Sequence, residues 1–225
     1  MINLSGQRIL VTQAKDFMGP ALCAALAQCG AEVIADERLL TASQDAQTLI
    51  DSAGPLDALV INLALPAPST PVTQIEEAEW RQVFEVMVDP LPRLVRAVVP
   101  GMKARGGGKI VVMGSASALR GMKRAASYSA ARGAQLAYVQ AAGVELAPDN
   151  IQLNAVAQNF VDNPTYFPPE VQANPRFQER LKREVPLGRL VKAEEDASFV
   201  AYLCSDAASC FVGQVFPMSG GWAVR

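Results

Sequence analysis

Residues 8–35 read RILVTQAKDFMGPALCAALAQCGAEVIA, and this stretch decides the fold class. The pattern predicts a buried strand at 8–12, an apolar helix at 19–28 closed by Gly30, and a second strand at 31–35. Two strands joined through a helix need a crossover connection, so they are expected to run parallel. In such units the turn after the first strand lies where parallel sheets bind their ligands.

Strands and helices alternate along the rest of the chain. Further strands are predicted at residues 57–62, 109–114, 150–157 and 213–216, and further helices at 41–53, 77–104, 126–146, 176–184 and 194–205. This order predicts an α/β fold, a Rossmann-like doubly wound parallel sheet with helices on both faces. Residues 161–175 hold four prolines and are predicted to form an irregular lid. Without repeats, low-complexity tracts or linkers, residues 1–225 are predicted to form a single domain.

Composition excludes several classes of function. The 225 residues carry a formal net charge of -2 and no histidine. Histidine-based triads and metal sites that depend on imidazole are therefore excluded, and we expect no metal. We also expect no nucleic-acid partner and no membrane span, since the chain has neither a basic character nor a long apolar run. No signal peptide opens the sequence, and the four cysteines suit apolar packing in a reducing cytoplasm, so a cytoplasmic location is expected.

Three residues form a candidate acid–base centre. Tyr128 and Arg132 are spaced i and i+4 on a predicted helix, so they share one face. Ser115 follows a predicted strand end. A neighbouring cation favours the phenolate form of a tyrosine and lowers its pKa, and arginine supplies a permanent charge. Each residue alone is typical of packing, of a surface pair or of a turn, whereas the joint pattern indicates a catalytic base with a hydroxyl that holds a substrate oxygen.

The turn after the first strand departs from a nucleotide-binding pattern. Of the glycines in a Gly-x-x-x-Gly-x-Gly phosphate cradle only Gly19 remains, and Phe17 stands at one of the other positions. A ring at Phe17 is expected to fill the space that a phosphate would need. Asp36 follows the second strand, where an acidic residue can bind a ribose hydroxyl, although a remnant or capping role explains it equally well.

On these residues the chain resembles the short-chain dehydrogenase/reductase superfamily over nearly its full length. Within that superfamily it resembles the halohydrin dehalogenases, which have Tyr-x-x-x-Arg in place of Tyr-x-x-x-Lys. The matching positions are Thr12, Phe17, Gly19, Ser115, Tyr128 and Arg132. The resemblance implies a cofactor-independent lyase that converts vicinal haloalcohols to epoxides with release of halide and a proton. It implies the reverse reaction as well, in which halide, azide or cyanide opens an epoxide.

The resemblance also implies where substrate and halide bind. The halide is expected between Phe17 and the loop of Gln158, Asn159, Phe160 and Val161, where backbone N–H groups and apolar rings suit a weakly hydrated anion. Phe160 and Val161 are equally compatible with core packing. Residues expected to line the haloalcohol or epoxide substrate are Leu65, Leu119, Met122 and Phe167.

Two other functions remain open. The chain can be an NAD(P)-dependent oxidoreductase with a degenerate cofactor site, or a non-enzymatic sensor or scaffold of the same fold. Relatives in the superfamily are commonly tetramers, so a homo-oligomer, either tetramer or dimer, is expected. Its contacts are expected on the helices at 77–104 and 126–146.

Overall fold

The computed structural model describes residues 2–224 and contains a six-stranded parallel sheet with the strand order β2-β1-β3-β4-β5-β6. The strands are β1 (Arg8–Val11), β2 (Glu32–Ala35), β3 (Ala58–Ile61), β4 (Gly108–Ser115), β5 (Ile151–Gln158) and β6 (Val215–Met218). The chain passes from β1 outward to β2 and then returns past β1 to β3. This reversal is the topological switch point of a doubly wound sheet, as predicted.

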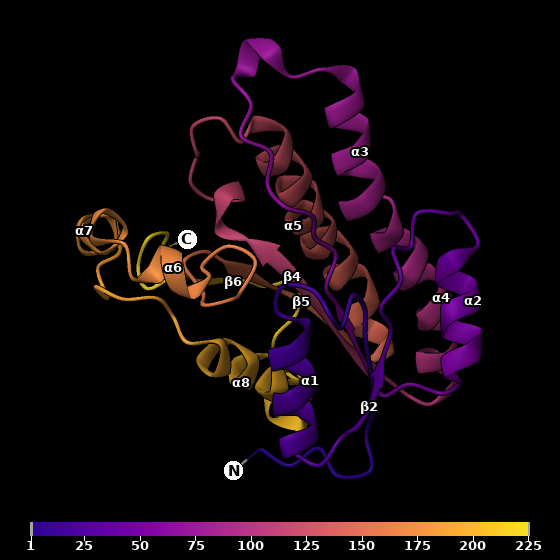
Figure 1. Ribbon diagram of the computed structural model, residues 1–225. Helices are drawn as coiled ribbons and strands as arrows, with labels where there is room; N and C mark the ends of the chain where they lie inside the picture. The colour runs from indigo at the N-terminus through magenta and orange to yellow at the C-terminus, as the bar shows by residue number, and fades with distance from the viewer. Residues whose placement is uncertain (1, 225) are drawn as a thin grey trace.

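Helices cover both faces of the sheet (Figure 1). The α-helices are α1 (Gly19–Gln28), α2 (Asp45–Ala53), α3 (Glu77–Met87), α4 (Pro90–Ala104), α5 (Ala126–Leu146), α6 (Pro169–Gln172), α7 (Pro175–Glu184) and α8 (Ala193–Cys204). One face packs on α2, α4 and α5, and the other packs on α1 and α8. The alternation within β3 explains the two cores, because Leu59 and Ile61 enter the first while Ala58 and Val60 enter the second.

The connection between β2 and β3 is short. Only α2 lies in it, as predicted for this stretch, and the sheet therefore ends at β2 on that side. A second strand and helix would need more residues than the chain provides there.

The predicted helix at 77–104 is wrong in one respect, since the chain breaks between α3 and α4. Pro90 has no N–H to donate into the preceding turn. The N–H of Asp89 reaches back to the carbonyl of Phe84, and the N–H of Leu91 bonds to the carbonyl of Val88. The i to i−4 ladder is lost for one turn, and α4 starts with Pro90 as its first residue.

The lid contains one turn of helix, α6, within otherwise irregular chain. The expectation that all cysteines are buried is wrong for Cys210, which is exposed in the turn that leads to β6. Cys204 is buried, and Cys23 and Cys29 are half-buried. Among the described residues, no helix has the length and apolar character needed to cross a membrane. Residues 2–224 also contain no cluster of acidic and cysteine side chains suited to a metal ion.

Candidate active site

A cavity of about 320 Å³ lies at the carboxyl ends of β1, β3, β4 and β5. All three predicted catalytic residues and all five predicted halide residues line it. Two of the four predicted substrate residues, Met122 and Phe167, line it as well. Its described lining includes Arg132 and Arg180 but no carboxylate. The cavity therefore favours uncharged or anionic ligands.

Leu65 and Leu119 do not line the cavity. The side chain of Leu65 packs beside Val83 and Met87, and that of Leu119 packs against the main core. The sequence places both residues just beyond strand ends, but it does not show which way their side chains turn. Leu65 still contributes to the site through its backbone carbonyl, which accepts a hydrogen bond from the hydroxyl of Tyr166 at 3.1 Å.

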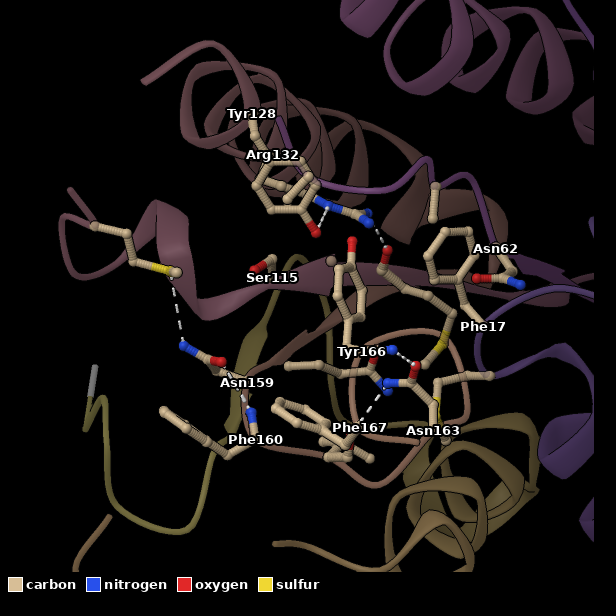
Figure 2. Close-up of a pocket in the computed structure, with 18 of the residues that line it drawn as sticks. Phe17, Asn62, Ser115, Tyr128, Arg132, Asn159, Phe160, Asn163, Tyr166 and Phe167 are labelled. Carbon is tan, nitrogen blue, oxygen red and sulfur yellow. Dashed lines mark hydrogen bonds between the residues drawn. The ribbon is translucent and has the colours of Figure 1, made fainter. Parts of the chain in front are cut away.

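Tyr128 and Arg132 meet on the inward face of α5, as their spacing predicts (Figure 2). The Nε of Arg132 donates to the Tyr128 hydroxyl at 3.1 Å, and both residues are buried. The Nη1 of Arg132 donates to the carbonyl oxygens of Leu63 and Met113, at 3.1 and 2.8 Å. Within residues 2–224 no carboxylate forms an ion pair with Arg132, so its charge is not neutralised and can stabilise a phenolate at Tyr128.

Gln135 completes this network, and the sequence analysis missed it. Its side-chain oxygen accepts from Nη1 of Arg132 at 2.9 Å, and its Nε2 donates to the carbonyl of Met87 at 2.6 Å. Gln135 is fully buried, so both groups depend on these partners. The spacing of Tyr128, Arg132 and Gln135 at i, i+4 and i+7 was the available signal, because it places three polar residues on one face of a predicted buried helix.

Ser115 is the last residue of β4 and faces the cavity. Its hydroxyl accepts from the backbone N–H of Ser117 at 3.2 Å and donates to the Ser117 hydroxyl at 3.0 Å. It thereby caps the short 3-10 helix at Ala116–Ala118. The turn that fixes the chain after β4 also fixes this hydroxyl, which needs only to rotate its hydrogen to bind a ligand oxygen.

The turn after β1 has the backbone conformation of a glycine-rich turn, although two of its three glycine positions carry larger side chains. Gln13 and Phe17 stand at the two missing glycine positions, and both have positive φ, +44° and +51°. The third position remains Gly19, because a Cβ there would lie 2.5 Å from the backbone of Ala14. Left-handed backbone is costly for residues other than glycine, so other contacts must hold the turn in this form.

Those contacts come from Gln13 and Asn62. The side-chain oxygen of Gln13 accepts from the N–H of Ala64 at 2.7 Å, and its Nε2 donates to the Ala64 carbonyl at 3.3 Å. The side chain of Asn62 donates to the carbonyls of Gln13 and Asp16, each at 3.1 Å. The Phe17 ring lies 5.5 Å from the ring of Tyr166. These side chains occupy the turn where a pyrophosphate would rest, so the residues present do not fit a dinucleotide.

The expected N–H donors at the loop after β5 are already engaged. The N–H of Asn159 donates to the carbonyl of Met218, and the N–H of Phe160 donates to the Asn159 side-chain oxygen at 2.9 Å. The backbone N–H groups at these two positions therefore already have acceptors within the protein. The rings of Phe160 and Phe167 are stacked at 6.0 Å, which gives this wall its apolar surface.

Gln158 lines the same wall but turns its amide nitrogen away from the cavity. Its Nε2 donates at 2.5 Å to Oδ2 of Asp196, a fully buried residue of α8. The other oxygen of Asp196, Oδ1, has no partner within residues 2–224. Burial raises the pKa of Asp196 to about 7, and the hydrogen bond from Gln158 only partly opposes this. Halide contact through the Gln158 amide would require its rotation.

Tyr166 is a second phenol in the cavity that the sequence analysis missed. It lies in the lid, where the N–H of Tyr166 donates to the side chain of Asn163 at 3.0 Å. Its hydroxyl points toward that of Tyr128 (Figure 2). A tyrosine in a proline-rich loop carries no periodic signal, so only the folded lid brings it to the site.

Comparisons with known proteins find similarity to dehydrogenases and to dehalogenases. A family model described as enoyl-(acyl carrier protein) reductase matches residues 5–223. Cis-4-hydroxycyclohexanecarboxylate dehydrogenase of Sinomonas cyclohexanicum is 33% identical over 171 residues, which span 75% of this chain and 66% of that enzyme. The uncharacterized oxidoreductase YmfI of Bacillus subtilis is 33% identical over 184 residues, 81% of this chain and 74% of that protein.

Two solved structures of dehalogenases superpose on this chain. A protein described as a dehalogenation enzyme superposes with a TM-score of 0.90 at 34% identity, covering 99% of this chain and 100% of that one. A halohydrin dehalogenase bound to ethyl (2S)-oxiran-2-ylacetate superposes with a TM-score of 0.88 at 26% identity, covering 97% and 98%. The family model spans nearly the whole chain, and the sheet, the Ser-Tyr centre and these relatives agree with it: the protein is an enzyme of the short-chain dehydrogenase/reductase superfamily.

Proposed function

We propose that the protein is a cofactor-independent halohydrin dehalogenase, which converts vicinal haloalcohols to epoxides with release of halide and a proton. The observation that carries the proposal is the filled turn after β1. Gln13 and Phe17 stand at two glycine positions of the phosphate-binding pattern. The proposed acid–base residues Ser115, Tyr128 and Arg132 all line the cavity. The 34% identity to a dehalogenation enzyme over its full length supports the same conclusion.

In the proposed mechanism Tyr128 is the general base. Its phenolate, stabilised by the guanidinium of Arg132, takes the hydroxyl proton of the substrate. Ser115 holds the same substrate oxygen and orients it. The developing alkoxide forms a C–O bond to the neighbouring carbon as the carbon–halogen bond breaks, and halide leaves with the bonding electrons. General-base help of this kind is typically worth about 10² to 10⁴ in rate, and the intramolecular nucleophile needs no covalent enzyme intermediate.

The leaving halide is proposed to settle between Phe17 and the loop of residues 158–161. Aromatic rings on both sides provide a weakly hydrating environment. The cavity lining contains arginine but no carboxylate, which favours an anion there. The N–H of Phe160 becomes available once the Asn159 side chain turns away from it. The same site can supply halide, azide or cyanide for epoxide opening in the reverse direction.

The test is bromide release from 1-bromo-2-propanol by purified protein with no nucleotide added. We expect turnover by the wild type and its loss in Tyr128→Phe, with unchanged circular dichroism. Tyr202→Phe is the matched control, because it removes the same hydroxyl from a tyrosine on the far α8, where that hydroxyl donates to the carbonyl of Ala207. No bromide release by the wild type, or near-normal release by Tyr128→Phe, would refute the proposal.

The competing function is an NAD(P)-dependent oxidoreductase. One observation favours it besides the dehydrogenase relatives: Asp36 at the end of β2 is buried and has an unpartnered oxygen, Oδ2. Its other oxygen accepts from Arg38 at 2.7 Å, so the carboxylate already has a cationic partner. Titration with NADH and NADPH, followed by the fluorescence of the nicotinamide, decides between the two functions.

We also propose a homo-oligomer, tetramer or dimer, that contacts through α3, α4 and α5, the helices that replace the predicted ones at 77–104 and 126–146. The outer face of α5 presents Gly133 with open space above it and Val144 with 68% of its surface exposed. Small residues let two such helices approach closely. Light scattering coupled to gel filtration measures the assembly, and introduction of Arg at Gly133 is expected to reduce its size.

A further inference from the structure

Tyr166 brings a second hydroxyl to the catalytic base. The lid carries it over the cavity, and its ring packs on Phe17 at 5.5 Å. Its hydroxyl donates to the carbonyl of Leu65 at 3.1 Å. Figure 2 shows the hydroxyls of Tyr128 and Tyr166 pointing toward one another from the two sides of the cavity. The Tyr166 proton therefore has two acceptors within reach, the Leu65 carbonyl and the Tyr128 oxygen.

The surroundings of Tyr166 favour its neutral, protonated form. The pKa of Tyr166 is raised above its ordinary value, first by burial and then by the neighbouring Tyr128. Arg132 opposes this effect, and it already donates its Nε to Tyr128. The other charged side chain of the cavity lining is Arg180 on α7, whose Nε forms an ion pair with Glu184 at 3.1 Å. The two phenols are thus unequal, since one is held beside the guanidinium and the other is held protonated.

We propose that Tyr166 is a positioning residue that donates a hydrogen bond to the Tyr128 phenolate, so that Tyr166 and Arg132 share the stabilisation of the charged base. The hydroxyl hydrogen needs only to rotate about the Cζ–O bond, away from Leu65 and toward Tyr128. Hydrogen bonds to charged oxygens are stronger than those to neutral carbonyls, so ionisation of Tyr128 drives this rotation. The catalytic consequence rests on the proposed function, whereas the pairing of the phenols does not.

The proton transfers of the proposed reaction are consistent with this role. The substrate hydroxyl proton moves to the Tyr128 oxygen, and Tyr166 keeps its own proton throughout. As the Tyr128 charge disappears, the Tyr166 hydroxyl returns to the Leu65 carbonyl. The effect is to populate the phenolate at lower pH, which is where a general base must work.

A simpler role is that of a latch, in which Tyr166 only holds the lid closed through Leu65 and Phe17. A latch predicts weaker substrate binding when the hydroxyl is removed, with no change in how Tyr128 titrates. The two roles therefore separate in a titration of Tyr128 without substrate.

The experiment is carbon-13 NMR of full-length protein labelled at tyrosine Cζ, in which each of the four tyrosines gives its own signal. The Tyr128 signal is assigned from Tyr128→Phe. We expect Tyr166→Phe to move the Tyr128 titration to a pH about one unit higher, as loss of one hydrogen bond to a charged oxygen implies. Tyr202→Phe should leave the Tyr128 titration in place. An unmoved Tyr128 titration in Tyr166→Phe would overturn the proposal.

A second experiment measures the rate of bromide release as a function of pH. In Tyr166→Phe we expect the rise of kcat with pH to move up by the same amount, so that activity near pH 7 falls about tenfold and recovers at higher pH. A raised KM with an unmoved pH profile would instead support the latch. If no variant or wild type releases bromide, the proposed function fails, and the NMR titration still decides the pairing of the two phenols.

Discussion

Gln13 is joined to Ala64 by two hydrogen bonds, one from each end of its side-chain amide. The pair connects the turn after β1 to the segment after β3, and it places a polar side chain where the glycine pattern would leave empty space. The contact is buried at both residues, so it contributes both to stability and to the shape of the cavity. This relationship leads to the first prediction.

Gln13→Ala should destabilise the protein by about 1–3 kcal/mol, because the buried N–H of Ala64 loses its acceptor. Gln13→Gly loses the same bonds but relaxes the φ of +44°, so it should be about 1 kcal/mol more stable than Gln13→Ala. Urea unfolding followed by circular dichroism measures both. Equal stability of the two variants would show that the turn is not held in a strained conformation.

Gln135→Met should reduce kcat for bromide release about tenfold with little change in KM. The substitution keeps the volume of the side chain but removes the acceptor of the Arg132 Nη1 and the donor to Met87. A guanidinium free to tilt stabilises the Tyr128 phenolate less well, and a misplacement of this kind typically costs one or two orders of magnitude. Gln140→Met, on the exposed side of α5, is the matched control. If both variants keep wild-type kcat, the orienting role of Gln135 is wrong.

Asp196 should make stability depend on pH. Its folded pKa of about 7 lies above its unfolded value, near 4, so the native state holds a proton over this range that the unfolded chain has lost. The free energy of unfolding should therefore fall as the pH rises from about 4 to about 7, by at most about 4 kcal/mol, and level off above that. The lowered pKa of Glu195, about 2, acts below this window.

Asp196→Asn removes the titrating group while its side-chain oxygen can still accept from Gln158. Its unfolding free energy, measured in urea at pH 5 and pH 8, should differ much less between the two values than that of the wild type. The variant should also be the more stable protein at pH 8. An identical pH dependence in both proteins would place the titration elsewhere.

Asn159→Ala should tighten bromide binding several-fold. It frees the N–H of Phe160 from its present acceptor and removes a carbonyl oxygen from the anion site. Trp222, whose ring lies 6.2 Å from that of Phe160, reports binding through quenching of its fluorescence. Every protein in this experiment also carries Trp80→Phe, so that Trp222 is the only tryptophan that fluoresces. Asn174→Ala is the control, since Asn174 caps α7 through the same kind of bond to a backbone N–H. Unchanged bromide affinity in Asn159→Ala would mean that the halide does not use Phe160.

Local patterns were enough to predict the fold and to place Tyr128 beside Arg132. The apolar runs gave the strands and both long crossover helices, and α1 and α5 were predicted with their observed ends. The Tyr128–Arg132 contact follows from i, i+4 spacing within one helix. The break at Pro90 was missed because the apolar periodicity continues through it. A proline within a predicted helix, which has no N–H to donate, was the signal that could have revealed the break.

The rest of the site depends on contacts that sequence periodicity does not encode. Gln13 reaches Ala64, and Tyr166 reaches Leu65, across long stretches of chain. The acceptor of the Phe160 N–H is a neighbouring side chain whose rotamer depends on the folded loop. The side-chain direction of Leu65 and Leu119 depends on the packing around them in the same way.

The positive φ angles at Gln13 and Phe17 show that the main chain of this turn already has the left-handed conformation that glycine adopts readily. Glycine at both positions would therefore open the turn without an insertion, a deletion or a rebuilt loop. For protein engineering this means that a library confined to two codons is a direct way to ask whether this scaffold can be given a dinucleotide site.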